Sequence, residues 1–336
     1  MASARATLRQ LADELASVPI VITGGTGFVG LALVDAVMRA RRAPLYVLDL
    51  HPLKPELVRH LPHHEAYFQR IDLTDRAAVS ELARSLPERF ALVHAASLVS
   101  TRSALEQASI RELDVSAAMV LSMLDAFGSR IAAACFISSF EVYGKLDPLT
   151  IEERHPSEPT RVYGIGKLIA EALFESGGRT HGFPVSMLRL SHVYGRFEHI
   201  TSATHELRAG RAIPSFLRNA MHERPILLNG DGGDLRDYVH VDDVAQAMLR
   251  ALLGANRGAY LIASGQSVSM REVAQTCVRA CQSSSAIQQQ PRKGERADFK
   301  VSIDKARKEL GYVPLVSLDE GLLDEARVMK QVGLHV

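Results

Sequence analysis

The chain has 336 residues, of which 47% are hydrophobic and 23% charged, with a formal net charge of +1. This balance gives no electrostatic case for binding nucleic acid or an acidic membrane, and no apolar run approaches the ~20 residues that cross a bilayer. The three cysteines (Cys135, Cys277 and Cys281) form neither a disulfide framework nor a metal-ligand pattern, so we predict no metal site and a reducing, cytoplasmic location.

Residues 1–18 have a pattern of their own. Leu8, Leu11, Leu15 and Val18 fall on one side of a possible helix. We therefore predict an N-terminal extension that forms a helix and packs on the body of the protein or on a partner subunit. A frayed tail is the alternative.

The first predicted strand leads into the sequence Thr-Gly-Gly-Thr-Gly-Phe-Val-Gly at residues 23–30. Glycines at such a strand-to-helix turn allow the backbone to approach a pyrophosphate, which then lies at the positive end of the helix. The pattern predicts a dinucleotide site. The residues expected to contact the dinucleotide here are Gly24, Gly27, Phe28, Val29 and Gly30.

The second predicted strand ends in Asp49. This acid lies about 20 residues beyond the glycine loop, where a carboxylate hydrogen-bonds the adenosine ribose hydroxyls. Because a carboxylate repels a 2′-phosphate, Asp49 favours NAD over NADP, although His51 and Lys54 nearby keep NADP open. The alternative role for Asp49 is that of a loop or cap residue.

Short apolar runs alternate with helical patterns as far as residue 190, which predicts a parallel sheet covered on both faces. The expected strands are 20–23, 46–50, 66–71, 91–95, 133–138, 185–190 and 259–262, and the expected helices are 31–41, 76–86, 103–127, 162–175, 239–253, 304–310 and 318–332. The stretch 196–229 predicts a helix at most, and 283–294 reads as a mobile Ser/Gln/Pro loop.

The fold class that follows is α/β, a Rossmann-type doubly wound parallel sheet with a smaller C-terminal substrate-binding lobe. We expect a dinucleotide-binding domain at 19–190, joined by a return segment at about 235–263. The substrate-binding lobe is expected from 191–234 and 264–336.

A candidate catalytic group lies in the later part of the first domain. Tyr163 and Lys167 are four residues apart, so both project from one face of the predicted helix. A lysine charge favours the phenolate and should lower the pKa of Tyr163, which suits a general acid/base for hydroxyl–carbonyl interconversion. Ser139 ends a predicted strand at the sheet edge where ligands bind, and its hydroxyl could hold the substrate oxygen. A solvated surface pair is the alternative for Tyr163 and Lys167.

Several motifs in order along the chain resemble one family, the extended short-chain dehydrogenases/reductases of the NAD-dependent epimerase/dehydratase type. The resemblance runs from about Ile20 to Leu322. The matching motifs are the glycine loop 23–30, Asp72-Leu73, His94-Ala95-Ala96, Ser139 ahead of Val-Tyr-Gly, Tyr163 with Lys167, Leu-Arg-Leu-Ser-His-Val-Tyr-Gly at 188–195, and Gly-Asp-Gly-Gly-Asp-Leu-Arg-Asp-Tyr-Val-His-Val-Asp-Asp at 230–243.

The resemblance implies roles for these residues. Asp72 and Leu73 would contact the adenine, while Ala95 and Ala96 would run along the cofactor. Val193 and its neighbours would pass beside the nicotinamide. Lys167 would also bind the nicotinamide ribose, with Ser139 and Tyr163 catalytic. NAD would accept hydride from a sugar carbon, giving a 4-keto intermediate.

The resemblance also implies where a nucleotide diphosphate sugar would bind. Arg236 would contact the diphosphate, because its planar fork suits phosphate oxygens, and its alternative is a structural ion pair. Arg292 is the second candidate arginine, although Arg296 competes with it for that role. His192 stands where many members carry Asn, and Arg196 replaces the usual proline; both put the standard substrate pose in question.

Glu141 follows Ser139 by two residues, as the glutamate does in the 4,6-dehydratases and decarboxylases of the family. Phe140 replaces the aspartate that protonates the leaving hydroxyl in dTDP-glucose-type dehydratases, and a phenyl ring donates no proton. Some simple epimerases carry the same glutamate, so Glu141 is either a catalytic or substrate-binding group or a structural carboxylate.

The leading hypothesis is therefore an NAD-dependent nucleotide-sugar 4-epimerase. The alternatives are C5-directed dehydration or decarboxylation by Glu141, an NAD(P)-dependent reductase of a non-nucleotide substrate, and a non-catalytic NAD-binding scaffold. The resemblance also implies a homodimer that packs helices 103–127 and 162–175 against their copies.

Overall fold

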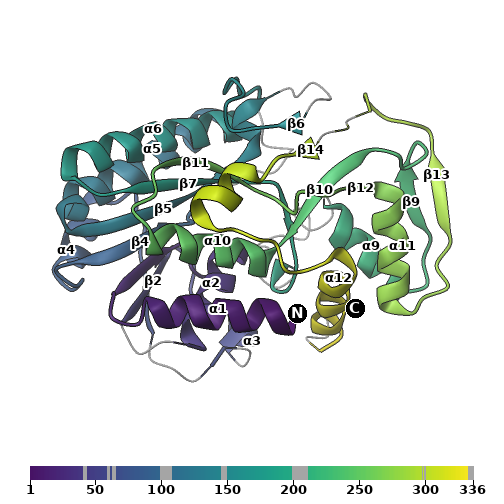
Figure 1. Ribbon diagram of the computed structural model, residues 1–336, viewed down its shortest axis with the longest axis horizontal. Helices are drawn as coiled ribbons and strands as arrows, with labels where there is room; N and C mark the ends of the chain where they lie inside the picture. The colour runs from purple at the N-terminus through teal and green to yellow at the C-terminus, as the bar shows by residue number, and fades with distance from the viewer. Residues whose placement is uncertain are drawn as a thin grey trace.

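A seven-stranded parallel sheet forms the centre of the larger part of the protein (Figure 1). Its strand order is β11-β7-β5-β4-β1-β2-β3. The strands are β1 (Ile20–Thr23), β2 (Leu45–Asp49), β3 (Tyr67–Arg70), β4 (Phe90–His94), β5 (Ile131–Ser139), β7 (Val185–Leu190) and β11 (Gly258–Ile262). The computed structural model describes residues 1–40, 44–58, 61–62, 66–98, 108–144, 150–198, 211–296, 298 and 300–331. The order reverses between β1 and β4, which confirms the predicted Rossmann-type fold.

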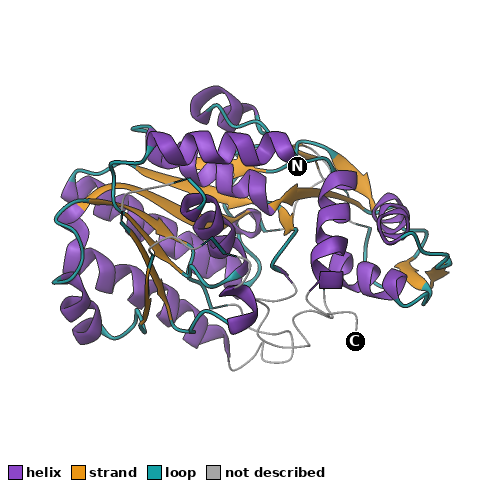
Figure 2. Cartoon of the chain, turned by 90° about the horizontal axis from the view of Figure 1, so that it is seen from below, coloured by secondary structure: helices purple, strands orange, loops and turns teal. Residues whose placement is uncertain are grey.

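Helices cover both faces of this sheet (Figures 1 and 2). One face carries α1 (Ala2–Glu14), α2 (Phe28–Met38) and α10 (Val241–Leu253), and the other carries α4 (Arg76–Ala83), α5 (Ala108–Phe127) and α6 (Val162–His181). The short helices α3 (Pro55–Val58), η2 (Gly128–Arg130) and η3 (Phe140–Tyr143) connect the larger elements. None of the described helices is long and apolar enough to cross a membrane.

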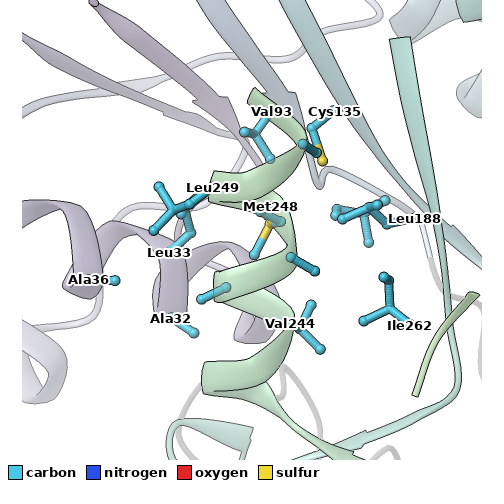
Figure 3. Packing of buried hydrophobic residues seen from close by; sticks show 14 of the residues in the cluster. Ala32, Leu33, Ala36, Val93, Cys135, Leu188, Val244, Met248, Leu249 and Ile262 are labelled. Carbon is cyan, nitrogen blue, oxygen red and sulfur yellow. The ribbon is translucent and has the colours of Figure 1, made fainter. Parts of the chain in front are cut away.

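The alternation of side chains along β5 explains the two cores. Cys135 and Ile137 point into the core under α2 and α10, whereas Ala134 and Phe136 point into the core under α5 and α6. Strand β5 is buried on both faces, as its continuous apolar run predicts. In Figure 3, Met248 of α10 lies between the side chains of α2 and those of the central strands.

A second group of elements lies beyond the carboxyl ends of these strands. It contains a three-stranded sheet of β8 (His192–Tyr194), β10 (Leu235–His240) and β12 (Ser267–Ser269), and a pair of β9 (Ile226–Asn229) with β13 (Ile287–Gln290). The helices α9 (Ala212–Met221), α11 (Met270–Cys281) and α12 (Leu318–Gln331) enclose its own apolar core. Strands β6 (Thr150–Ile151) and β14 (Lys300–Val301) form a small parallel pair, and η4 (Ala306–Leu310) precedes α12.

Two sequence expectations for this region were wrong. The stretch 283–294 was expected to be a mobile loop, yet it contains β13, and 196–229, expected to hold at most a helix, also contains β9. Strand β13 consists of Ile287 and three glutamines, a polar composition that hides its strand character, because its parallel pairing with β9 is decided by tertiary contact. The segment 235–263 divides, since β10 joins the three-stranded sheet whereas β11 joins the main sheet.

Helix α1 packs along α2 and α10 (Figure 1). Leu8, Leu11 and Leu15 are buried in the core that these helices share with the sheet. Arg5 also pairs with Asp324 of α12 at 3.3 Å. The predicted helix 103–127 begins at residue 108 within the described chain, and residues 103–107 lie outside it.

Candidate active site

The glycine loop lies at the point where the strand order reverses. Gly24 has φ +70°, and a Cβ there would meet the backbone nitrogen of Ala96 at 2.4 Å. A Cβ at Gly30 would meet the carbonyl oxygen of Gly24 at 2.2 Å. Gly27, the N-cap of α2, has no side chain to cap the helix. The first N–H groups of α2 therefore face a turn built without side-chain bulk, as a pyrophosphate site requires.

Asp49 is held against this loop. Its carboxylate accepts the backbone N–H groups of Thr26 and His51, each at 3.0 Å. The acid at the end of β2 thus lies beside the glycine loop, although the two are separated by about 20 residues of chain.

The other predicted cofactor residues also lie at this edge of the sheet. Asp72 accepts the N–H and hydroxyl of Thr74 at 2.9 and 2.7 Å, and these bonds lower its pKa. Leu73 is buried beside it. Ala95 continues β4 by donating its N–H to the carbonyl of Thr23 at 2.9 Å, which brings the Ala95–Ala96 segment against Gly24. These contacts fit a dinucleotide laid across the carboxyl ends of β1, β2 and β4.

Ser139 is the last residue of β5 and the N-cap of η3. Its hydroxyl accepts the N–H of Glu141 at 3.2 Å. The carboxylate of Glu141 lies 3.6 Å from Arg161, and its side chain is 29% exposed. Gly164 packs against the carbonyl of Glu141, where a Cβ would come within 2.4 Å. The start of α6 is therefore pressed onto the turn that carries Ser139 and Glu141.

Tyr163 and Lys167 share one face of α6, as predicted, with the lysine Nζ 5.6 Å from the phenol ring centroid. Lys167 is buried and donates to the carbonyl of Ile137 at 2.7 Å. Burial lowers its pKa to about 8, against the opposing effect of Glu171 and Glu112.

The pKa of Tyr163 is shifted upward, whereas the sequence led us to expect a downward shift. Burial raises this pKa above its ordinary value, and the negative charge of Glu141 raises it further, while Arg211 lowers it in part. The phenol thus stays protonated in the protein alone, because burial and the negative charge of Glu141 both oppose the phenolate.

His192 lies among aromatic rings at the start of β8. Its ring centroid is 5.0 Å from that of Phe140 and 5.5 Å from that of Tyr238. Burial lowers its pKa to about 4, and the charges of Arg236 and Arg211 also lower it. A neutral imidazole is therefore the form present near neutral pH.

The strands β8 and β10 bring the predicted substrate residues together. Val193 is paired with Val239, and His192 with Tyr238. Arg236 lies two residues before Tyr238 and so on the same face of β10. Its guanidinium donates to the carbonyl of Leu235 at 2.8 Å.

Arg292 and Arg296 both form ion pairs with aspartates. Arg292 binds both carboxylate oxygens of Asp234 at 3.1 and 3.0 Å and reaches Asp231 at 3.3 Å. Arg296 pairs with Asp298 at 2.5 Å. Substrate contact by Arg292 would require it to leave or share Asp234, so its role in substrate binding stays a prediction.

Arg196 turns away from the residues described above. Its guanidinium pairs with Asp35 of α2 at 2.7 Å and with Asp242 of α10 at 2.8 Å, and all three side chains are at most 8% exposed. The arginine that replaces the expected proline therefore joins α2 and α10 on one face of the sheet.

Sequence reasoning missed two groups near these residues. Arg211, the N-cap of α9, pairs with the buried Glu198 at 2.8 Å and acts electrostatically on both Tyr163 and His192. Glu171 of α6 binds Arg189 and Ser138 beneath Lys167. The signal that could have identified Glu171 is its spacing, because residues 163, 167 and 171 follow one another at intervals of four and share one helix face. For Arg211 the only signal in the sequence is a proline near the start of the helix that it precedes.

Comparison with known families decides the assignment. Residues 20–263 match the NAD dependent epimerase/dehydratase family. The chain belongs to this family. It is an enzyme of that family, and its cofactor is NAD, as the glycine loop and Asp49 predicted.

Individual relatives point to two reactions. The chain is 27% identical over 317 residues to a dTDP-glucose 4,6-dehydratase of Streptomyces niveus, covering 91% of this chain and 90% of that protein. It is 27% identical over 314 residues to a putative UDP-glucose 4-epimerase of Methanocaldococcus jannaschii, covering 93% and 98%. A Thermus thermophilus UDP-glucose 4-epimerase in complex with NAD superposes with a TM-score of 0.76 at 25% identity, covering 93% and 99%.

Proposed function

We propose that the protein is an NAD-dependent 4-epimerase of a nucleotide diphosphate sugar. The observation that carries this choice is Phe140, which occupies the position between Ser139 and Glu141 and packs on His192 at 5.0 Å. A phenyl ring against a neutral imidazole supplies no acid to protonate a leaving hydroxyl. Elimination of water therefore lacks its proton donor at this position, whereas epimerisation needs none.

The proposed mechanism uses the groups at the end of β5 and the start of α6. The glycine loop and Asp49 would hold NAD, which would supply the acceptor and donor for the hydride at C4 of the sugar. Ser139 would hold the O4 oxygen by a hydrogen bond. Tyr163 would take the O4 proton as the phenolate and later give it back, and the positive charge of a bound nicotinamide would act with Lys167 to favour that phenolate against burial and Glu141. Lys167 fixes the local geometry through Ile137 and supplies the positive charge that favours the phenolate.

Glu141 supports a second candidate function. Its carboxylate follows Ser139 by two residues and is 29% exposed, and its charge raises the pKa of Tyr163. A carboxylate beside a 4-keto sugar could remove the C5 proton, which the keto group acidifies, or assist loss of a C5 carboxylate. The same first oxidation would then lead to C5-directed dehydration or decarboxylation.

We also propose that Arg236 binds the substrate diphosphate, with His192 contacting it or the neighbouring sugar. The support is the charge around β8 and β10, where Arg236 and Arg211 both act on His192. The guanidinium of Arg236 suits phosphate oxygens, and Arg211, which pairs with Glu198 at 2.8 Å, adds a second guanidinium that acts on His192.

A panel of UDP-, dTDP-, GDP- and CDP-sugars tests the proposal, with products identified by mass and by sugar analysis. We expect epimerisation at C4 without change of mass, and NAD released from the purified protein by acid. Tyr163→Phe should lower turnover by a factor of at least ~100, and Glu141→Gln should leave epimerisation within a few-fold of the wild type. Loss of water or carbon dioxide, abolished by Glu141→Gln, would instead establish the second candidate.

We further propose a homodimer formed through α5 and α6, in the cytoplasm. The two helices approach closely because Gly166 and Gly177 face side chains of α5, and Leu121 and Ile169 are partly exposed along them. The three cysteines are free and buried, which fits a reducing compartment. Light scattering tests the assembly: a monomeric mass at micromolar concentration contradicts it.

A further inference from the structure

A buried ion pair lies directly beneath the proposed catalytic residues. Glu171 of α6 binds Arg189 of β7 through two hydrogen bonds of 3.0 and 2.7 Å. The side chains are 5% and 9% exposed, respectively. Glu171 also accepts the hydroxyl of Ser138 at 2.5 Å. The carboxylate therefore joins the helix that carries Tyr163 to two neighbouring strands.

The sheet register explains why these groups meet. Ser138 of β5 is the parallel partner of Arg189 of β7, so both side chains stand on the face covered by α6. Glu171 follows Lys167 by one helical turn and reaches down to both. Arg189 also lies 4.8 Å from the ring centroid of Tyr143, in the turn that follows Ser139. One network thus contacts the strand before Ser139 and the turn after it.

We propose that Glu171 is a positioning residue, whose ion pair with Arg189 and hydrogen bond from Ser138 fix the Ser139 hydroxyl relative to Tyr163 and Lys167. The inference rests on the proposed function for its catalytic consequence. Lys167 ties the carbonyl of Ile137 to α6, and Glu171 ties the next residue of β5 to the same helix. Two successive attachments leave the following residue, Ser139, with little freedom to move along or away from α6.

The alternative to this positioning role is purely structural, in which the pair only fills the core. A buried ion pair is replaceable by apolar residues of similar volume with little loss of stability, whereas removing one partner costs several kcal/mol. The double variant Glu171→Leu/Arg189→Met therefore keeps the fold and removes the attachment to Ser138. Ser138→Ala removes only the hydroxyl and leaves the ion pair.

A matched control lies one turn further along the same helix. Glu175 forms an exposed ion pair with Arg179 at 2.8 Å, with side chains 57% and 67% exposed. Glu175→Gln removes the same carboxylate chemistry from α6 without touching β5. We expect it to behave as the wild type in every measurement.

The experiment combines steady-state kinetics with amide hydrogen exchange of the holoprotein over residues 137–144. In the double variant we expect kcat to fall by a factor of about 10 to 100, since small misplacement of reacting groups has effects of this size, with KM and NAD affinity within twofold. The kcat of Ser138→Ala should fall by about threefold to tenfold. Exchange of these amides should rise about tenfold in the double variant.

The exchange rates and kcat values together test the positioning role of Glu171. Unchanged exchange overturns the positioning role, and so does faster exchange with unchanged kcat, because the order would then not serve the chemistry. A wild-type protein that converts no nucleotide sugar refutes the proposed function, and the exchange measurement then tests the attachment by itself.

Discussion

Replacing Arg196 tests whether the buried charges behind the sheet hold the protein together. The substitution is Arg196→Leu, which keeps much of the volume and removes the guanidinium. Asp35 and Asp242, exposed by 1% and 0%, then lose the partner they share. Removing one member of such a buried group costs about 3–5 kcal/mol, because a desolvated carboxylate is left behind.

The magnitude and its pH dependence follow from the same contacts. For 336 residues the entropy of unfolding is about 0.7 kcal/mol per kelvin, so the loss corresponds to a fall in Tm of roughly 4–7 °C. Burial tends to raise the pKa of Asp242, and the charge of Arg196 holds it below its ordinary value. In the wild type this carboxylate therefore stabilises the fold above pH ~4. In Arg196→Leu, burial raises the pKa of Asp242 without the opposing charge of the arginine. The loss of stability relative to the wild type should therefore be smaller at pH 5 than at pH 8.

Thermal unfolding followed by circular dichroism at pH 5 and pH 8 measures both effects. The matched control is Arg39→Leu, which removes a half-exposed arginine paired with the same Asp35 at 2.8 Å. We expect this control to cost less than about 1 kcal/mol. A fall in Tm below 1 °C for Arg196→Leu, or a deficit that does not change with pH, would refute the reasoning.

Two further predictions concern the nucleotide-binding edge. Gly24→Ala should abolish NAD binding in a titration, because its Cβ would lie 2.4 Å from the backbone nitrogen of Ala96. The control is Gly182→Ala, at φ +80° with open space around it, which should cost about 1 kcal/mol of stability and leave NAD affinity intact. Equal NAD affinities of the two variants would contradict this prediction. His94 is buried, bonded to Thr23 at 2.6 Å, and its pKa is lowered to about 3 by burial. The stability that the neutral His94 contributes is present above pH ~6.5 and is lost on acidification, by up to about 1.4 kcal/mol per pH unit. Denaturant titrations at a series of pH values should therefore show a shallower fall of the unfolding free energy with acidification in His94→Gln than in the wild type. Parallel pH dependences of the two proteins would count against the prediction.

The residues that sequence reasoning placed correctly belong to regular elements or to the turns between them. Gly24 and Gly30 were identified because a tight strand-to-helix turn imposes its own residue types. Tyr163 and Lys167 were placed on one face because helical spacing alone decides it. Neither inference needed knowledge of any distant segment.

The errors concern groups whose surroundings come from elsewhere in the chain. The pKa of Tyr163 was expected to fall because Lys167 was considered alone, but burial and Glu141 raise it. The ion pair of Arg292 with Asp234, 58 residues earlier, was not foreseen either, while its role in substrate binding stays a prediction. Strand β13 was missed since only pairing with β9 orders its glutamines.

Local spacing along the chain was enough to predict the parallel α/β fold, the NAD loop with its acid, and the positions of Ser139, Tyr163 and Lys167. Which charges meet depends instead on how distant segments pack. Arg196 reaches Asp35 across 161 residues, and Glu171 meets Ser138 across 33. Such pairs depend on sheet register and helix packing, where burial magnifies every electrostatic contact, and no pattern along the chain encodes them.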